Sequence, residues 1–191
     1  MTSGASEATQ RLFFALWPDA AARAALAAAV TEPVRLSGGR AVAESNLHVT
    51  LAFLGSVAQP RVRELRQIAS AVAAVCSDEQ PLTLRFDALA HWPRPQVLCL
   101  TAHTASPRLL ALAMALRDAA AAAGFTPDLK PFHAHVTVTR KVVTYPSLSI
   151  LAPLEWRFDS FALIDSRTEE RGPVYSVVES WPLVKAAKAG E

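Results

Sequence analysis

Apolar runs and alternating segments along the chain predict a series of β-strands. Residues 82–89 alternate Leu, Leu and Phe with Thr, Arg and Asp, which is the pattern of a strand that buries one face. Elsewhere, short continuous apolar runs bounded by turn residues predict buried strands. The predicted strands are residues 12–16, 47–54, 82–89, 97–101, 154–164 and 174–181.

Three segments between these strands predict helices. Residues 60–75 place apolar side chains every three or four positions, and residues 19–30 and 107–123 are rich in alanine and leucine. We expect Pro33 to end the first of these helices and Gly124 to cap the last. The predicted apolar stripe of the middle helix consists of Val62, Leu65, Ile68, Ala69, Val72 and Val75.

Polar, proline-rich and terminal stretches predict the remaining organisation. Residues 91–95 contain two prolines and are expected to form a stiff turn, and the polar stretch around Arg167 is expected to be a loop. We expect residues 1–10 to be a disordered leader and residues 185–191 a flexible tail. Residues 11–184 then form a single domain.

Two of the predicted strands carry the same four-residue pattern. One reads His-Val-Thr-Leu from His48, and the other reads His-Val-Thr-Val from His135. Positions i and i+2 of a strand project from the same face. His48 therefore shares a face with Thr50, and His135 shares a face with Thr137, while the apolar residues point into a core. Two imidazoles presented in this way are candidates for an acid and a base.

A strand, a helix and a histidine-bearing strand follow one another twice at similar spacing. His48 lies 35 residues after Phe13, and His135 lies 37 residues after Leu98. We interpret this period as an internal duplication, because duplicated lobes commonly face each other across a pseudo-two-fold axis. Such an axis would bring both histidines to one cleft.

Composition limits the classes of function. The chain has 191 residues, 51% of them hydrophobic, so it can bury a sizeable core. The net charge of +2, without runs of Lys or Arg, permits an anionic substrate but does not suggest a wide nucleic-acid footprint. Cys76 and Cys99 lie in apolar stretches and are interpreted as small buried hydrophobes. We find no signal-like or membrane-spanning run, and we expect a cytoplasmic monomer.

The paired motifs favour acid–base chemistry on a phosphodiester. One imidazole can deprotonate water while the other protonates the leaving oxygen. The hydroxyls of Thr50 and Thr137, with the nearby Arg140, are placed to bind phosphoryl oxygens. A zinc site at the two histidines is the alternative, but the motifs contain no carboxylate that would complete a ligand set. We therefore expect neither a metal nor another cofactor.

The motifs resemble those of the 2H phosphoesterase superfamily, and within it the RNA 2′,3′-cyclic phosphodiesterases, also described as 2′-5′ RNA ligases. The resemblance covers most of the chain. Residues 11–16 are similar to the opening strand of that family, residues 46–55 to its first motif, residues 131–140 to its second, and residues 166–175 to its closing stretch. Ala134 and Val138 depart from the Pro and Leu that are common there, but neither changes a catalytic residue type.

The resemblance implies an α+β, bilobal fold with two pseudo-symmetric lobes. Each lobe would hold an antiparallel sheet with helices outside, and the active-site cleft would lie between the lobes. The implied reaction is metal-independent opening of an RNA terminal 2′,3′-cyclic phosphate to a 2′-phosphate, with 2′-5′ ligation in some members. RNA ends or cyclic nucleotides are the implied substrates. By the same analogy, His48 is the proton donor and His135 the proton acceptor.

Further residues are candidates for contact with the substrate. Phe13 and Phe14 are candidates for stacking on a base, with at least one of them expected in the core. Tyr175 and His133 are candidates because they lie in or beside the family-like stretches. Two other functions are open: a phosphodiesterase for another cyclic nucleotide or a 2′-5′ oligonucleotide, and a nucleotide-binding module without turnover.

Overall fold

The computed structural model describes residues 8–102, 104–128, 130–145, 153–170 and 172–185. Most of the predicted leader and tail lies outside these ranges, so those two predictions are not tested there. Thr9 and Gln10, however, belong to the first strand and not to a disordered leader, because they pair with Ala58 and Val57.

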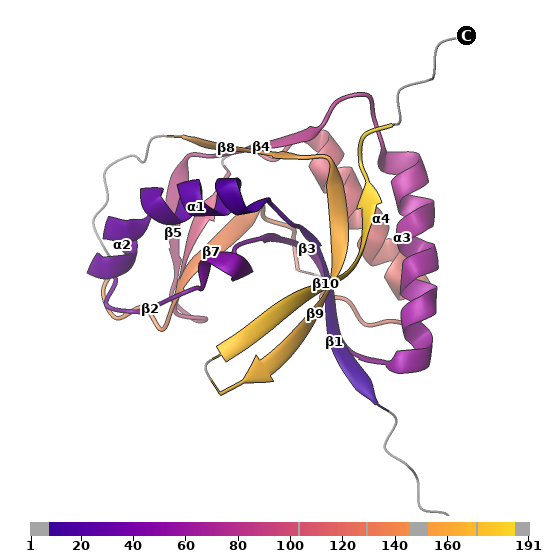
Figure 1. Ribbon diagram of the computed structural model, residues 1–191, viewed down its shortest axis with the longest axis horizontal. Helices are drawn as coiled ribbons and strands as arrows, with labels where there is room; N and C mark the ends of the chain where they lie inside the picture. Colours follow the sequence, from indigo (N-terminus) through magenta and orange to yellow (C-terminus); the bar gives the residue numbers. More distant parts are fainter. Residues whose placement is uncertain (1–7, 103, 129, 146–152, 171, 186–191) are drawn as a thin grey trace, which may run out of the picture.

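Two four-stranded antiparallel sheets form the frame of the molecule (Figure 1). The first sheet has the order β10-β9-β1-β3, and the second has the order β2-β7-β6-β5. A separate antiparallel pair joins β4 to β8. The strands are β1 (Thr9–Leu16), β2 (Arg40–Ala41), β3 (Val49–Ala58), β4 (Leu82–Phe86), β5 (Ala88–Trp92), β6 (Val97–Thr101), β7 (His135–Arg140), β8 (Leu154–Phe158), β9 (Ser160–Glu169) and β10 (Gly172–Pro182).

Helices cover the outer sides of the two sheets. Helices α3 (Val62–Cys76) and α4 (Pro107–Ala122) pack against each other and against the first sheet. Helices α1 (Ala20–Ala29) and α2 (Thr31–Leu36) lie on the side of β2, β5 and β7 (Figure 1). Short 3-10 turns, η1 (Glu44–Asn46) and η2 (Gln59–Arg61), precede β3 and α3. Each lobe therefore presents one sheet face toward the interior of the molecule.

Strand β1 is buried on both faces, which explains its continuous apolar sequence. Leu12, Phe14 and Leu16 belong to the main core, which also takes in residues of both sheets and of α3 and α4. Phe13 and Ala15 face the other way and form a smaller cluster with two apolar residues of β9. This second cluster supports the functional face of the first sheet.

A β-bulge interrupts each motif strand at the same place. On β3, Thr50 pairs with Ala15 and Ala52 pairs with Phe14, so the register skips the residue between them. On β7 the register again skips the residue after the motif threonine. The skipped residues are Leu51 and Val138, the fourth positions of the two motifs. This shared irregularity supports the duplication inferred from spacing, because bulges are specific local features.

Several predicted boundaries were wrong for identifiable reasons. The predicted strand 82–89 breaks at Asp87, because the chain leaves the β4–β8 pair there and joins the second sheet as β5. Strand β3 runs beyond Leu54 through Gly55, whose φ of +73° suits glycine, and ends at Ala58. Pro33 does not end a helix but lies in the first turn of α2, where its missing N–H is tolerated.

Three further predictions about local structure are corrected. The expected polar loop at Arg167 is the paired end of β9, and the expected turn begins only after Trp92, the last residue of β5. In α3 the apolar stripe ends before Val75, which is 85% exposed. The predicted helices at 19–30, 60–75 and 107–123 are otherwise confirmed within one or two residues.

The packing of α3 predicts a large difference between two substitutions on the same helix. Leu65→Ala removes a fully buried side chain, and we expect it to lower the free energy of unfolding by about 2–5 kcal/mol. Val75→Ala, at the exposed position, should change it by less than about 0.5 kcal/mol. Urea unfolding followed by circular dichroism measures both values. Equal losses would show that the end of α3 is buried as well.

Candidate active site

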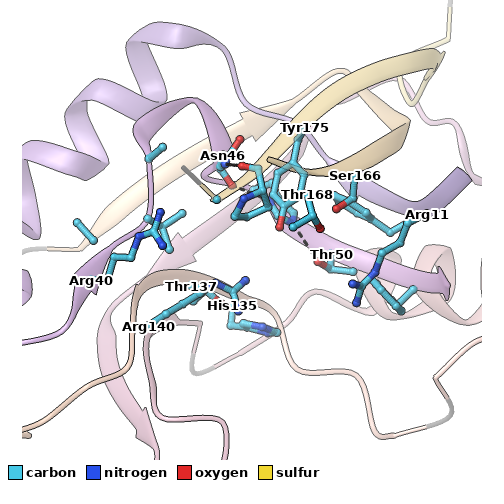
Figure 2. Close-up of a pocket in the computed structure, with 18 of the residues that line it drawn as sticks. Arg11, Arg40, Asn46, Thr50, His135, Thr137, Arg140, Ser166, Thr168 and Tyr175 are labelled. Carbon is cyan, nitrogen blue, oxygen red and sulfur yellow. Dashed lines mark hydrogen bonds between the residues drawn. The ribbon is translucent and has the colours of Figure 1, made fainter. Parts of the chain in front are cut away.

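A cavity of about 700 Å³ lies between the two sheets and is lined by the histidine and threonine of both sequence motifs (Figure 2). His48 and Thr50 enter it from the first sheet, and His135 and Thr137 enter it from the second. Arg140 lines the same cavity from the end of β7. The four motif residues and the arginine, which the sequence predicted to act together, therefore lie in one site.

His48 is held by its backbone surroundings and by aromatic rings. Its Nδ1 donates a hydrogen bond to the carbonyl oxygen of Asn46 at 2.7 Å. Asn46 is itself fixed, because its side-chain amide donates to the carbonyl of Pro173 on β10 at 2.7 Å. The rings that surround the imidazole, with centroid distances of 4.9, 5.5 and 5.3 Å, are Phe13, Trp17 and Tyr175.

His135 has a corresponding arrangement on the second sheet. Its Nδ1 donates to the carbonyl oxygen of His133 at 2.7 Å, and the ring of Trp92 lies 4.5 Å away between centroids. A carbonyl oxygen can only accept, so Nδ1 of each histidine carries a proton. The second nitrogen, Nε2, is therefore the atom of each neutral ring that has a lone pair for proton transfer.

The two motif threonines differ in what their hydroxyls contact. Thr50 Oγ1 lies 3.0 Å from Nε2 of His48 and can donate to it when that ring is neutral. Thr137 Oγ1 instead lies 3.7 Å from the sulfur of Cys99, its cross-strand neighbour. The residue opposite Thr50 is Ala15, which has no polar side chain to offer. The pseudo-symmetric lobes are thus chemically unequal at their threonines.

Burial favours the neutral form of both imidazoles. Desolvation lowers the pKa of His48 to about 4, and the nearby positive charges of His135, Arg140 and Arg23 act in the same direction. The hydrogen bond to Asn46 opposes the shift. The pKa of His135 is also lowered, mainly by burial; the hydrogen bond to the His133 carbonyl opposes this shift, and the charge of the His133 side chain adds to it. Bound negative charge would counteract these shifts.

The walls of the cavity are positively charged. Four cationic side chains line it together with several hydroxyls, and no Asp or Glu is found among the described residues of the lining. The cations are Arg11, Arg40, Arg140 and Lys141. The described residues also contain no group of three His, Cys, Asp or Glu side chains that could hold a metal ion. This electrostatic environment suits an anion.

The four additional candidates have different outcomes. Tyr175 lines the cavity beside His48, so it stays a candidate for contact with the substrate. Phe14 is wrong as a substrate contact, because it is fully buried in the main core against Phe161 and Trp181. Its neighbour Phe13 is the residue that faces the cavity. The side chain of His133 is exposed and does not line the cavity; its carbonyl, however, holds the ring of His135.

Sequence reasoning missed several residues of the cavity. Phe53 reaches it because the bulge at Leu51 shifts the alternation of β3 by one position. Arg40 reaches it from β2, a strand of two residues that no periodicity reveals. Trp92, which was placed in the predicted turn, instead ends β5, and its ring contacts His135. An aromatic residue directly before Pro93 was the available signal for that contact.

None of the described helices is long and apolar enough to cross a membrane.

Known proteins resemble this chain over most of its length. A family model described as the 2′-5′ RNA ligase superfamily matches residues 17–170. An RNA 2′,3′-cyclic phosphodiesterase of Thermus thermophilus is 30% identical over 186 residues, with 91% of this chain and 90% of the relative covered. One of Escherichia coli K12 is 31% identical over 182 residues, with 92% and 98% covered.

A solved structure shows the same fold. The crystal structure of E. coli LigT complexed with 3′-AMP superposes with a TM-score of 0.83 at 28% sequence identity, covering 93% of this chain and 100% of that one. The match confirms the bilobal α+β fold predicted from the sequence, with antiparallel sheets on the two sides of a cleft.

The lowered pKa of His48 predicts a dependence of stability on pH. Between its ordinary value of 6.5 and about 4, the unfolded chain binds a proton at this position and the folded protein does not. The free energy of unfolding should therefore fall as the pH decreases through this window. Urea unfolding at several pH values should show a shallower fall for His48→Gln than for the wild type. Identical slopes would mean that the folded protein protonates His48 normally.

Proposed function

The chain belongs to the 2′-5′ RNA ligase superfamily, and from this premise we propose that it hydrolyses the terminal 2′,3′-cyclic phosphate of RNA to a 2′-phosphomonoester. One observation carries the proposal: two imidazoles from opposite sheets enter one cavity that cations line. The names of the relatives support the activity, and the family resemblance inferred from the motifs is confirmed.

The proposed reaction divides proton transfer between the two histidines. Nε2 of His135 takes a proton from water, and the water oxygen forms a bond to phosphorus. The bond between phosphorus and the 3′-oxygen breaks, and Nε2 of His48 gives its proton to that oxygen. The phosphoryl group stays on the 2′-oxygen. The hydroxyls of Thr50 and Thr137, with Arg140, stabilise the negative charge on the phosphoryl oxygens.

The environment of His48 supports its role as the acid once substrate is bound. Burial and the positive charges of the cavity favour the neutral ring. A phosphodiester brings a negative charge into the same space, which favours the imidazolium form that the acid needs. His135, in contrast, must be neutral to accept a proton, and its lowered pKa keeps it neutral near pH 7. The charged substrate acts on both rings, so the two roles require that it raise the pKa of His48 more than that of His135.

The contact between Cys99 and Thr137 supports the assignment of His135 as the base. The hydroxyl of Thr137 is shared with the Cys99 sulfur, whereas the hydroxyl of Thr50 contacts its own histidine. Among the described residues, none hydrogen-bonds Nε2 of His135, so water can approach that nitrogen. The histidines, threonines and arginine of the site all belong to one chain, so we expect a monomer to be active. We propose that it acts on RNA ends in the cytoplasm.

The proposal predicts turnover without an added metal ion. Incubation with a cyclic-ended oligoribonucleotide should give a 2′-phosphate end at the same rate with and without EDTA, because protein side chains supply the acid, the base and the charge stabilisation. Product identification by ³¹P NMR distinguishes 2′- from 3′-phosphate. Loss of activity in EDTA with recovery in zinc or manganese would contradict the mechanism, and no turnover of any cyclic nucleotide would favour a binding module.

A sulfur-substituted substrate tests which histidine is the acid. On the normal substrate, His48→Ala and His135→Ala should each lower kcat by at least about 10²-fold. When sulfur replaces the 3′-oxygen, the thiolate leaves without protonation, because thiols are much stronger acids than alcohols. The thio substrate should therefore restore turnover by His48→Ala but not by His135→Ala.

The exposed side chain of His133 provides the matched control for this test. His133→Ala removes an imidazole but keeps the backbone carbonyl that orients His135, so it should retain near wild-type kcat. Rescue of His135→Ala in place of His48→Ala would exchange the two roles. Circular dichroism spectra of all three variants establish that each is folded.

A further inference from the structure

At one end of the cavity, Arg140, which the proposed reaction uses, has two further cations beside it that the reaction does not use. Arg40 on β2 and Arg140 on β7 lie directly opposite each other in the antiparallel ladder, and both line the cavity. Lys141 lines the cavity beside them. The strand pairing thus places two arginines side by side at the cavity wall.

The position of Arg40 is closely defined by the backbone around it. Gly39 approaches β7 so closely that an added Cβ would lie 2.7 Å from the carbonyl oxygen of Arg140. On the other side, an added Cβ at Gly172 of β10 would lie 2.7 Å from Nη2 of Arg40. Two close approaches thus hold β2 against β7 and let the Arg40 side chain pass along β10. This packing places the guanidinium at the cavity wall.

The charge in the cavity exceeds that of the reacting group. A cyclic phosphodiester carries a single negative charge, whereas Arg11, Arg40, Arg140 and Lys141 all line the space. Figure 2 shows Arg40 and Arg140 together at one end and Arg11 at the other. Arg11 lies over the ring of Phe53, with 5.0 Å between its guanidinium carbon and the ring centroid. Guanidinium groups and aromatic rings are planar surfaces on which a base can stack. The end with three cations is better suited to phosphate.

We propose that Arg40, together with Lys141, binds a second phosphate on the 5′ side of the nucleotide that is hydrolysed, while Arg140 contacts the reacting phosphate. Because the cyclic phosphate ends the strand, any further phosphate of the substrate lies on that side. The internucleotide phosphate of an RNA strand supplies this group, and so does the 5′-phosphate of a mononucleotide. The inference rests on the proposed function for the placement of the cyclic end, and it makes the cavity selective for strands over nucleosides.

The first test compares substrates that differ only in this charge. The substrates are a cyclic-ended dinucleotide, its analogue with a neutral methylphosphonate linkage, the nucleoside 2′,3′-cyclic phosphate, and that nucleoside with a 5′-phosphate. In the wild type, kcat/KM should be about tenfold higher for the charged dinucleotide than for its neutral analogue. A similar gain from the 5′-phosphate alone also supports the site and assigns it to mononucleotides. Equal values for the charged and neutral dinucleotides would overturn the proposal.

The second test places the effect on Arg40. In Arg40→Gln, the ratio of kcat/KM between charged and neutral dinucleotides should fall about tenfold, and the slope of log kcat/KM against log salt should become shallower by about 0.7. Arg40→Lys keeps the charge and should restore part of the ratio. The matched control is Arg63→Gln on the exposed face of α3, which should keep the wild-type ratio. A ratio that is unchanged in Arg40→Gln would overturn the assignment.

A binding measurement separates this inference from the proposed reaction. Calorimetry with the 2′-phosphorylated dinucleotide and its methylphosphonate analogue requires no turnover. Tighter binding of the charged ligand, lost in Arg40→Gln, supports the second phosphate site even if no cyclic phosphate is hydrolysed. Failure of hydrolysis would then count against the proposed function alone. Equal affinities in the wild type would count against the site.

Discussion

The antiparallel pairings of β3 with β1 and of β7 with β6 determine the positions of nearly all functional groups. Each pairing contains a bulge directly after the motif threonine. Before the bulge, alternation directs the histidine and the threonine to the cavity; after it, alternation restarts one residue later. Arg140 therefore shares the cavity face with Thr137 although three positions separate them, and Phe53 shares it with Thr50 in the same way.

Electrostatics and burial act together in this frame. The walls supply positive charge without a neighbouring carboxylate among the described lining residues, and the imidazoles are desolvated by aromatic rings. Both effects lower the histidine pKa values in the same direction. An anionic substrate raises these pKa values again, so substrate binding and protonation of the imidazole that acts as the acid are linked. A carboxylate partner for either imidazole would have weakened this dependence on substrate charge.

The sequence predicted the residues whose positions follow from local periodicity. His48, Thr50, His135 and Thr137 share faces because they stand two apart in strands, and the repeated order of elements placed them in one cleft. The choice between Phe13 and Phe14 could not be made, because both faces of β1 are apolar and buried, one against the main core and one against the small cluster. Arg40 could not be predicted, since its place depends on a two-residue strand and on glycines distant in the chain.

The backbone carbonyls that hold both imidazoles affect how the protein tolerates mutation. In sites where a carboxylate side chain orients the histidine, one substitution can release the ring or reverse its tautomer. Here the acceptors are the main-chain oxygens of Asn46 and His133, which every residue type possesses. The tautomer of each ring therefore depends on the backbone conformation just before each motif. Substitution of side chains in these segments leaves the tautomer unchanged as long as the backbone conformation is kept. Insertions or deletions in the two short segments before the motifs are the changes that would move these carbonyl oxygens away from the imidazoles.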